Sequence, residues 1–540
     1  MKIQLGTLFV TSAFVTSAVL MGPAMAQNAG PNPAQAAAKA LLQAADKAIG
    51  ASSVKSFTLA ATGWMGYPGQ QFATGDLPRS DLKSYNLTVD FASKSSKTEY
   101  VRVQGNQPIR GGGAGFPVRG EVSFTEFVAG DLGWNLNPQG QPVPILARDA
   151  SDRQLGLWLH PASFIQAALA DNNAAVTDRY FARQDRTLKV VAFTTKVCDR
   201  PQPQCTRRVT GEFNNDNMLE RVVTWITDPV LGDKMVEYRW SDYRDVGGGV
   251  KMPFRLHGHV GDHPLIPGGH NFIDLRMSDV KANVANAAQA VPDAARTAAP
   301  PQQNVVATTL APGVVLMAGG SHNSVAVEFK DFVTVIEAPL YQARSNAVIA
   351  EVKKTFPNKP IRYVVNTHNH FDHLGGIRTY VAEGATVITD ERNKDFYQRV
   401  VLAPQPRSLL PDRLSQRPFA PTGPGQNMLQ TFTDNYTITD GQQVIEIHYV
   451  EQFNHSDNMN IVYLPKAKIV INADMYGPPA AGGTLPFVSP NAVALYRNIK
   501  RLKLDVTTHV PIHGNPGPQA DFERIVGPEA ARAPQVGGGG

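Results

Sequence analysis

Four side chains of metal-binding type occur within six residues of this chain, directly after a predicted β-strand. The strand is IRYVVNT, residues 361–367, and His368, His370, Asp372 and His373 follow it. Because side chains alternate along an extended backbone, His368 and His370 point to the same side. Neutral imidazole and carboxylate are ligands that zinc takes, and burying so dense a polar cluster without a partner is costly. The segment therefore predicts a metal site at the carboxyl end of a strand.

The surroundings of this segment resemble the metallo-β-lactamase-fold hydrolases, whose signature HxHxDH is matched by residues 368–373. The resemblance covers about residues 305–525 and extends to three later positions in the order that this family uses. His455 stands at the start of a strand in FNHSDNMNIVYLP, Asp474 follows a strand in KIVINADMYGP, and His513 precedes a Gly in HVPIHG. All seven ligand positions of the family are therefore filled.

The resemblance implies a ligand set for two metal ions and a catalytic chemistry. It divides the seven side chains into three sets: His368, His370 and His455 for one ion, Asp372, His373 and His513 for the other, and Asp474 as a bridge. We expect two zinc ions per chain, although iron and manganese are not excluded by such a set. Two zinc ions that share a water lower its pKa toward neutral, so that a metal-bridging hydroxide attacks the substrate.

Two residues are candidates for direct catalytic roles. The family implies that Asp372 orients the hydroxide and accepts a proton. Tyr476, two residues after Asp474, is positioned in the sequence to donate a hydrogen bond to the developing oxyanion. The alternative for Tyr476 is a buried structural tyrosine.

The substrate class follows from the bridging position. Genuine β-lactamases of this fold usually carry Cys or Ser where Asp474 stands, and an Asp there resembles the glyoxalase II, lactonase and phosphodiesterase branches. We therefore expect hydrolysis of an ester-like bond, in a lactone, thioester or carboxylic ester. A β-lactamase is one alternative. A periplasmic ligand-binding or carrier protein with a secondary metal site is another, but the complete ligand set favours an enzyme.

The 540 residues exceed what one hydrophobic core usually supports, which predicts two domains. Residues 27–284 consist mostly of short β runs broken by Gly, Pro, Asn and Asp, and they faintly resemble the curved half-barrel sheets of periplasmic lipid carriers. Residues 285–304 have the Ala-, Pro- and Gln-rich composition of a linker. The resemblance implies an αββα sandwich for residues 305–532, and the tail 533–540 is predicted to be disordered. The fold class is α+β, with a mainly-β domain preceding the sandwich.

The first 26 residues have the pattern of a cleavable signal peptide. Lys2 precedes an apolar stretch, and Ala24-Met25-Ala26 offers a cleavage site before Gln27. A membrane anchor is the alternative, but the apolar run is marginal for spanning a bilayer. We expect export to the periplasm or outside the cell, without stable membrane insertion. The net charge of +5 is spread over the chain and predicts no nucleic-acid partner, so the expected partner is a small-molecule substrate. The oligomeric state stays open.

Several weaker features complete the sequence. Cys198 and Cys205 flank a Pro-rich turn, which predicts a small disulfide loop in an oxidising compartment. A segment that imitates the metal motif, RLHGHVGDH, lacks matching downstream ligands and is interpreted as a polar strand edge; it contains His257, His259, Asp262 and His263.

The remaining histidines and one long loop leave alternatives open. His322 and His448 have no partners by motif and are interpreted as structural, and His509 competes with His513 for the last ligand position. The Pro-rich stretch 403–426 is too long for a plain connector. It is either a substrate lid or a disordered insertion.

Overall fold

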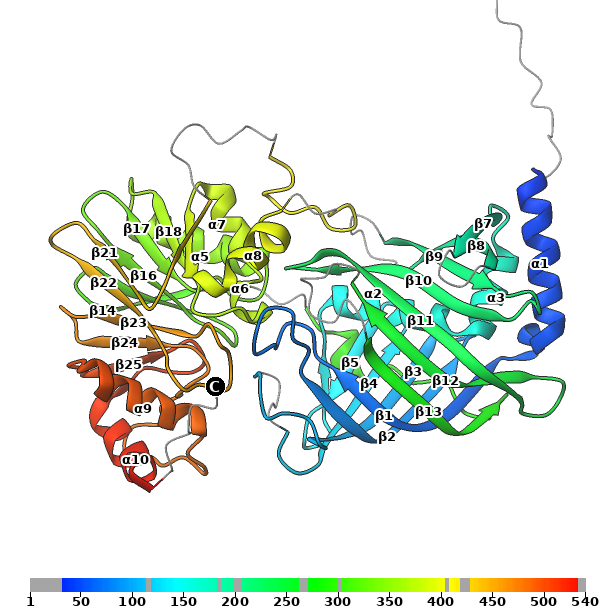
Figure 1. Ribbon diagram of the computed structural model, residues 1–540, viewed down its shortest axis with the longest axis horizontal. Helices are drawn as coiled ribbons and strands as arrows, with labels where there is room; N and C mark the ends of the chain where they lie inside the picture. The colour runs from blue at the N-terminus through cyan, green and yellow to red at the C-terminus, as the bar shows by residue number, and fades with distance from the viewer. Residues whose placement is uncertain are drawn as a thin grey trace, which may run out of the picture.

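The computed structural model of the protein describes residues 32–112, 118–181, 186–197, 205–261, 271–299, 303–403, 407–417 and 428–532. The predicted signal peptide, Cys198, Asp262, His263 and the tail 533–540 lie outside these residues. Figure 1 shows one large sheet on the right, built from residues 56–282, beside a unit with two sheets, built from residues 306–518.

The first unit is a 13-stranded antiparallel sheet in the order β6-β5-β4-β3-β2-β1-β13-β12-β11-β10-β9-β8-β7. Neighbouring strands follow one another in sequence except where β1 pairs with β13, which joins two meanders into one sheet. The strands are β1 (Ser56–Gly66), β2 (Arg79–Asp90), β3 (Ser95–Val103), β4 (Val122–Ala129), β5 (Leu132–Leu136), β6 (Pro142–Pro144), β7 (Ala175–Phe181), β8 (Arg186–Lys196), β9 (Thr206–Phe213), β10 (Leu219–Asp228), β11 (Gly232–Asp245), β12 (Lys251–Val260) and β13 (Asn271–Ala282).

Helices fill one face of this sheet. They are α1 (Pro33–Ile49), α2 (Ala147–Leu155) and α3 (Pro161–Ala170). Helix α1 starts with a capping box of Asn32 and Gln35 and ends at Gly50, whose φ of 68° suits glycine. The apolar sides of α1 and α3 bury against alternate residues of the strands in one cluster.

The second unit contains a 7-stranded sheet in the order β14-β15-β16-β17-β18-β19-β20 and a 6-stranded sheet in the order β21-β22-β23-β24-β25-β26. Strands β17 to β20 run parallel, as do β24 and β25. The first sheet consists of β14 (Val306–Ala311), β15 (Val314–Ala318), β16 (Ser324–Glu328), β17 (Val333–Ile336), β18 (Ile361–Val365), β19 (Thr386–Asp390) and β20 (Leu429–Phe432). The second consists of β21 (Asn435–Thr439), β22 (Val444–Tyr449), β23 (Asn460–Leu464), β24 (Ile469–Asn472), β25 (Thr508–Pro511) and β26 (Gly517–Pro518).

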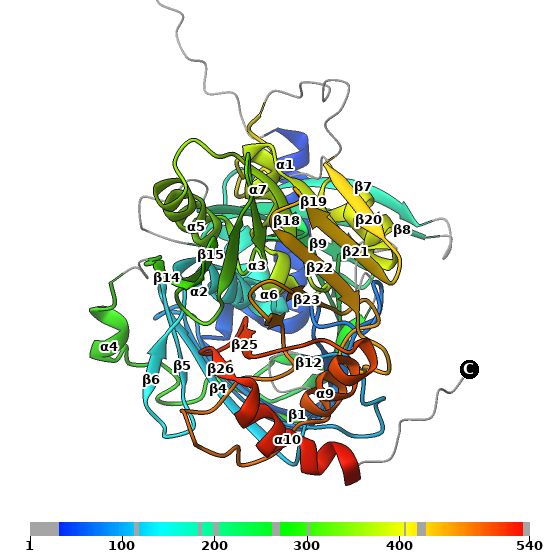
Figure 2. The same ribbon diagram turned by 90° about the vertical axis from the view of Figure 1, so that its left-hand side faces the viewer.

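Three apolar clusters hold the layers of this unit together. One cluster fills the space between the two sheets. A second joins the outer face of the first sheet to α5 (Gln342–Thr355), α7 (Ile377–Glu383) and α8 (Lys394–Phe396). A third joins the outer face of the other sheet to α9 (Pro490–Leu502) and α10 (Gln519–Arg532). Strands such as β17 and β24 are mainly apolar and buried over their whole length because both faces are covered. The predicted αββα sandwich is confirmed, with its two helical layers on opposite sides in Figure 2.

The connection between the units packs against the first sheet over its described part. It contains the short helix α4 (Asp293–Arg296), and Ala295 buries beside Trp134 of β5. The backbone N–H of Gln289 donates to the Ser95 hydroxyl over 3.0 Å. The segment predicted as a linker therefore packs along the first sheet over its described residues.

The turn between β10 and β11 docks on the second unit. Val230 and Leu231 bury in the cluster under α5 and α7, and the guanidinium of Arg407 donates to the Val230 carbonyl over 2.7 Å. Arg407 belongs to the Pro-rich stretch 403–426, of which residues 407–417 are described. This part of the stretch fastens the two units together, which is a role that the sequence did not suggest.

Two further observations bear on the location of the protein. Cys205 is disulfide-bonded. Among the helices of the described residues, none combines the length and the apolar character that a membrane crossing requires.

Candidate metal centre

The strand order brings the predicted ligands to one edge of the sandwich. The loop after β18 carries His368 and His370, and the short helix α6 (Phe371–Leu374) carries Asp372 and His373. Because parallel strands end at the same edge of a sheet, the loops after β24 and β25 meet there as well. Those loops supply Asp474 and His513, and the loop before β23 supplies His455.

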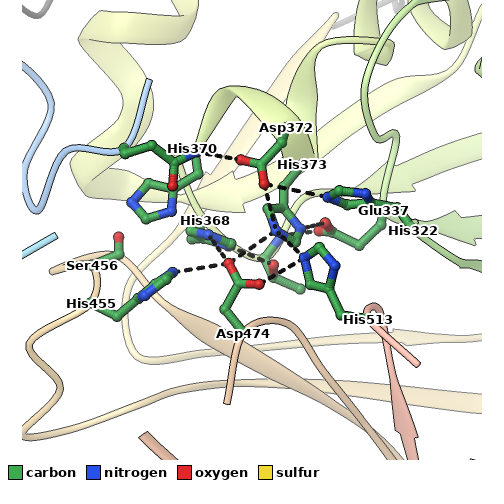
Figure 3. Close-up of polar contacts among 12 residues, drawn as sticks. His322, Glu337, His368, His370, Asp372, His373, His455, Ser456, Asp474 and His513 are labelled. Atoms are coloured by element: carbon green, nitrogen blue, oxygen red, sulfur yellow. Dashed lines mark hydrogen bonds and ion pairs between the residues drawn. The ribbon is translucent and has the colours of Figure 1, made fainter. Parts of the chain in front are cut away.

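The seven side chains converge on one space (Figure 3). Their ligand-type atoms form two groups, each with all of its atoms within 4.8 Å of one another. The members of the two groups are His368, His370, His455 and Asp474 in the first, and His322, Asp372, His373 and His513 in the second. The first group contains the histidines that the resemblance assigns to one ion together with Asp474, and the second contains the residues assigned to the other ion together with His322.

Asp474 lies between the two groups. Its Oδ2 is 2.9 Å from His455 Nε2 and 3.2 Å from His368 Nε2, in the first group. The same oxygen is 3.0 Å from His373 Nε2, and Oδ1 is 2.8 Å from His513 Nε2, in the second group. The backbone of Asp474 has a φ of 55°, an uncommon conformation for a residue other than glycine. A single carboxylate in contact with both groups has the position of a metal bridge.

The donor chemistry of the site fits a cation. The His370 ring donates from Nε2 to the carbonyl oxygen of Gln71 over 2.9 Å, because a carbonyl only accepts. Its Nδ1 lone pair then faces the cluster, buried and without a hydrogen-bond partner among the described residues. An unpaired buried acceptor costs about 1–3 kcal/mol, and a bound metal ion removes that cost. The two groups together hold two carboxylates and six imidazoles, which are donor types that a metal ion accepts.

The protonation states of His368 and Asp474 also suit metal binding. Burial, and then the neighbouring His373, lower the pKa of His368 to about 4. Burial raises the pKa of Asp474, but His373 and the hydrogen bonds from the other histidines lower it well below its usual value. At neutral pH the His368 imidazole is therefore neutral and the Asp474 carboxylate is charged. These are the forms in which both residues bind a metal.

Glu337 is a part of the site that the sequence did not reveal. It follows the buried strand β17, is fully buried, and has a φ of 70°. Its Oε2 accepts from Nδ1 of His373 over 2.6 Å, and its Oε1 accepts from the backbone N–H of Thr367 over 2.8 Å. Glu337 therefore fixes the ring of one ligand and the loop that carries the others. An acidic residue directly after the apolar run VTVI was the available signal.

His322, which has no partner by motif and was interpreted as structural, lies in the second group. Its Nε2 lies 3.3 Å from Asp372 Oδ2, and its ring lies 4.0 Å from that of His513. Burial lowers the pKa of His322, so that the imidazole is neutral at neutral pH. The Ser321 hydroxyl contacts its Nδ1 over 2.8 Å. The signal for His322 was its position in the turn between two apolar strands, β15 and β16.

Tyr476 lies away from the cluster. Its ring packs 4.6 Å from Phe522 of α10 and 5.4 Å from His509, in the core beneath α9 and α10. These contacts favour the structural alternative for Tyr476. His509 is buried in the same core and contacts Gln519, so that His513 alone of the two histidines joins the cluster.

The segment that imitates the motif forms a polar network on the first sheet. His257 contacts Asp274, and His259 contacts Glu237, through their Nδ1 atoms. Asn271 lies 2.7 Å from both rings. The described part of this segment is thus held by its own strand neighbours, as expected for a polar strand.

Comparisons with known proteins agree with this geometry. The family described as the metallo-beta-lactamase superfamily matches residues 317–511. A linear primary-alkylsulfatase from Pseudomonas sp is 38% identical over 61 residues, so that the match spans 11% of this chain and 9% of that protein.

Solved structures that are similar to the chain include two metallo-beta-lactamases. The one from Pontibacter korlensis is 19% identical, with 43% of this chain and 100% of that chain covered and a TM-score of 0.32. The one from Hirschia baltica is 19% identical, with 41% and 94% covered and a TM-score of 0.30. The family match lies on the observed αββα sandwich and includes most of the ligand positions in family order. Residues 317–511 therefore match the metallo-beta-lactamase superfamily, and the C-terminal half of this chain contains a domain with the metallo-β-lactamase fold.

Proposed function

We propose that this protein is a metal-dependent hydrolase that cleaves an ester-like bond in a small molecule, with two zinc ions as its cofactor. The observation that carries this proposal is the position of Asp474, whose carboxylate contacts ligand nitrogens of both groups. The family match in the C-terminal half and the two His/Asp groups support a metal-dependent enzyme. The bridging carboxylate supports the ester-cleaving assignment over a β-lactamase.

The ligands that we assign follow the two groups. The first metal position is formed by His368, His370 and His455, the second by Asp372, His373 and His513, and Asp474 is shared. When bound, zinc ions at these positions would supply a water of lowered pKa and would polarise the bond to be cleaved.

Asp372 is the residue that we assign to proton transfer. Its side chain is 29% exposed, whereas His368 and His373 beside it are fully buried. Gln70 donates to its Oδ1 over 2.8 Å, and His322 contacts its Oδ2. Two neighbours thus hold the carboxylate in one orientation while part of it faces solvent. In that position Asp372 can accept a proton from an attacking water and return it to a leaving group.

The exposed side of the site indicates the direction of substrate approach. The side chain of His513 is 37% exposed, and that of His455 is 4% exposed. The substrate therefore approaches the second metal position, along Asp372 and His513. Lactones, thioesters and carboxylic esters are the expected substrates. Sulfate esters are a second candidate class, favoured by the short similarity to a linear primary-alkylsulfatase.

Export is the second part of the proposal. The signal-like N-terminus predicts a mature protein that starts at Gln27, outside the cytoplasm. The disulfide bond of Cys205 supports an oxidising compartment. N-terminal sequencing of the protein from its native source tests this assignment. A chain that retains Met1 in the cytoplasm would contradict it.

A substrate screen with one variant and one control tests the enzymatic proposal. Zinc-loaded protein is assayed on lactones, thioesters, carboxylic esters, sulfate esters, phosphodiesters and β-lactams. We expect Asp474→Ala to reduce turnover of the best substrate about 100-fold or more at neutral pH. Asp395→Ala changes an exposed carboxylate in the same unit and should leave turnover unchanged. Circular dichroism verifies folding.

Equal turnover by folded, metal-loaded Asp474→Ala would refute the catalytic assignment. A screen in which no substrate is turned over, while an apolar ligand binds, would favour the carrier alternative.

A further inference from the structure

Two loops of the first sheet lie against the candidate metal centre. The loop between β1 and β2 spans residues 67–78, and the loop between β3 and β4 is described at residues 104–112 and 118–121. Figure 1 shows the first of them as a blue loop beside α6, and Figure 3 shows blue ribbon next to His370 and His455. Three backbone hydrogen bonds fasten the loops to the site: Phe371 N–H to Gly69 O at 2.9 Å, Asp457 N–H to Phe72 O at 3.0 Å, and Gly111 N–H to Asn454 O at 2.9 Å.

The first loop fixes the ring of His370. The carbonyl oxygen of Gln71 accepts the Nε2 proton of His370, which leaves Nδ1 as the atom that faces the other ligands. A hydrogen bond to the non-binding nitrogen of a histidine sets its tautomer and its orientation toward a metal. His370 is fully buried, so that water does not replace this acceptor. The tautomer of a ligand in the second unit is thus set by backbone from the first unit.

The same loop orients Asp372. The Gln70 side-chain amide donates from Nε2 to Oδ1 of Asp372 over 2.8 Å. The other oxygen, Oδ2, faces His322 and His373, at 3.3 and 3.7 Å. Gln70 therefore occupies one carboxylate oxygen and leaves the other for the second group. Its backbone carbonyl accepts from Gly112 N–H over 3.2 Å, which joins the two loops.

The second loop packs directly on His455. A methyl group built on Gly112 would overlap the Cε1 and Nδ1 atoms of the His455 ring. The φ of Gly112 is not positive, so that its backbone accepts other residues without strain. Glycine is required there because only a hydrogen atom fits between the loop and the ring. The backbone at Gly112 thus limits where the His455 ring can lie.

We infer that the first sheet contributes to the metal centre. Its loops position His370 and His455 for the first metal and Asp372 for the second. This inference rests on the proposed metal-dependent function. Gln70, Gln71 and Gly112 act through the ligands and are positioning residues. The inference gives the N-terminal unit a function that its own sequence motifs do not indicate.

The first test enlarges Gly112. Gly112→Ala should displace His455 and lower the affinity of the first metal position at least tenfold, in the range seen for changes around metal ligands. The control is Gly156→Ala, since Gly156 lies in open space with helical backbone angles. Each full-length protein is loaded with Zn²⁺ and dialysed against a series of chelator concentrations, and the metal per chain is measured.

The expected result is a chelator range in which wild type and Gly156→Ala hold two ions and Gly112→Ala holds one. Substitution with Co²⁺ gives a second readout, because the visible absorption of Co²⁺ reports the geometry of its ligands. All five tryptophans lie between residues 64 and 240, so that tryptophan fluorescence verifies folding of the first unit independently of the metal centre.

The second test removes the amide of Gln70. Gln70→Ala should weaken the second metal position about tenfold, and Gln139→Ala, which changes an exposed glutamine of the same sheet, should not. If Gly112→Ala fails to fold, the comparison of Gln70→Ala with Gln139→Ala tests the inference. Retention of both ions with wild-type affinity by every folded variant would overturn the inference. A wild-type protein that binds no metal would instead refute the proposed function itself.

Discussion

Replacement of Glu337 by Gln separates the role of charge at the site from the role of shape. The Glu337 carboxylate accepts two hydrogen bonds, from Nδ1 of His373 and from the backbone N–H of Thr367. Both donors are buried. A glutamine has the same size, but only one of its two terminal atoms accepts. One of the two buried donors would therefore face an NH₂ group, which cannot pair with it.

The magnitude follows from the type of bond that is lost. A hydrogen bond to a charged group contributes about 1.5–3 kcal/mol, and about 1.4 kcal/mol corresponds to a tenfold change in a binding constant. Glu337→Gln should therefore weaken the metal position that contains His373 by about 10- to 100-fold. The first metal position, which does not include His373, should change less.

Competition with a chromophoric chelator measures both dissociation constants for Zn²⁺. The control is Glu328→Gln, since Glu328 lies at the end of a strand in the same sheet and pairs with Lys359 at a distance from the ligands. We expect two dissociation constants for Glu337→Gln. The dissociation constant of the position that contains His373 should rise, and that of the first position should change less. Two dissociation constants equal to those of wild type, in a folded protein, would refute the assignment of His373 as a ligand oriented by Glu337.

Two further predictions concern buried histidines. Burial lowers the pKa of His160 from the usual 6.5 to about 3, so that the unfolded chain takes up its proton first as the pH falls. The free energy of unfolding of the first sheet should then fall by about 2 kcal/mol between pH 7 and pH 5. Urea titrations followed by tryptophan fluorescence measure this loss, and His160→Asn should abolish most of it. An equal loss in both proteins would contradict the reasoning. His322→Ala should weaken the second metal position about tenfold in chelator competition, whereas unchanged binding would mean that His322 only packs against His513.

The ligand positions could be predicted because they lie in short segments that connect to the ends of strands β18, β23, β24 and β25. His368, His370, Asp372 and His373 lie within six residues, and His513 is followed by a Gly. The sandwich then brings the ends of the strands together. The contacts of Glu337 could not be predicted in the same way. Its partners lie 30 and 36 residues later in the chain, and only the parallel pairing of β17 with β18 places them side by side.

The position of Tyr476 shows where a local rule fails. Tyr476 was a candidate because it stands two residues after Asp474 in the sequence. The strand β24 ends at Asn472, and Asp474 has a left-handed conformation, so that closeness in sequence does not place both side chains on one side. The ring of Tyr476 therefore enters the core beneath α10 instead of the site.

The contribution of the first sheet was beyond sequence reasoning. The strands of residues 56–282 were expected from their patterning, but the pairing of β1 with β13 is a contact between residues more than 200 positions apart. Gln70 and Gln71 lie about 300 residues before the ligands that they contact. Glutamines in a loop resemble any polar surface, and only the packing of the two units gives them partners.

The number of metal ions per chain tests the central claim most directly. Full-length protein is saturated with Zn²⁺, freed of excess ion and analysed for zinc and protein together, beside Asp474→Ala. Because Asp474 contacts both groups, we predict about two ions per chain in the wild type and a loss of tightly bound zinc in the variant. A wild-type value of one ion or fewer at saturation, or two tightly held ions in Asp474→Ala, would contradict a dinuclear site bridged by Asp474.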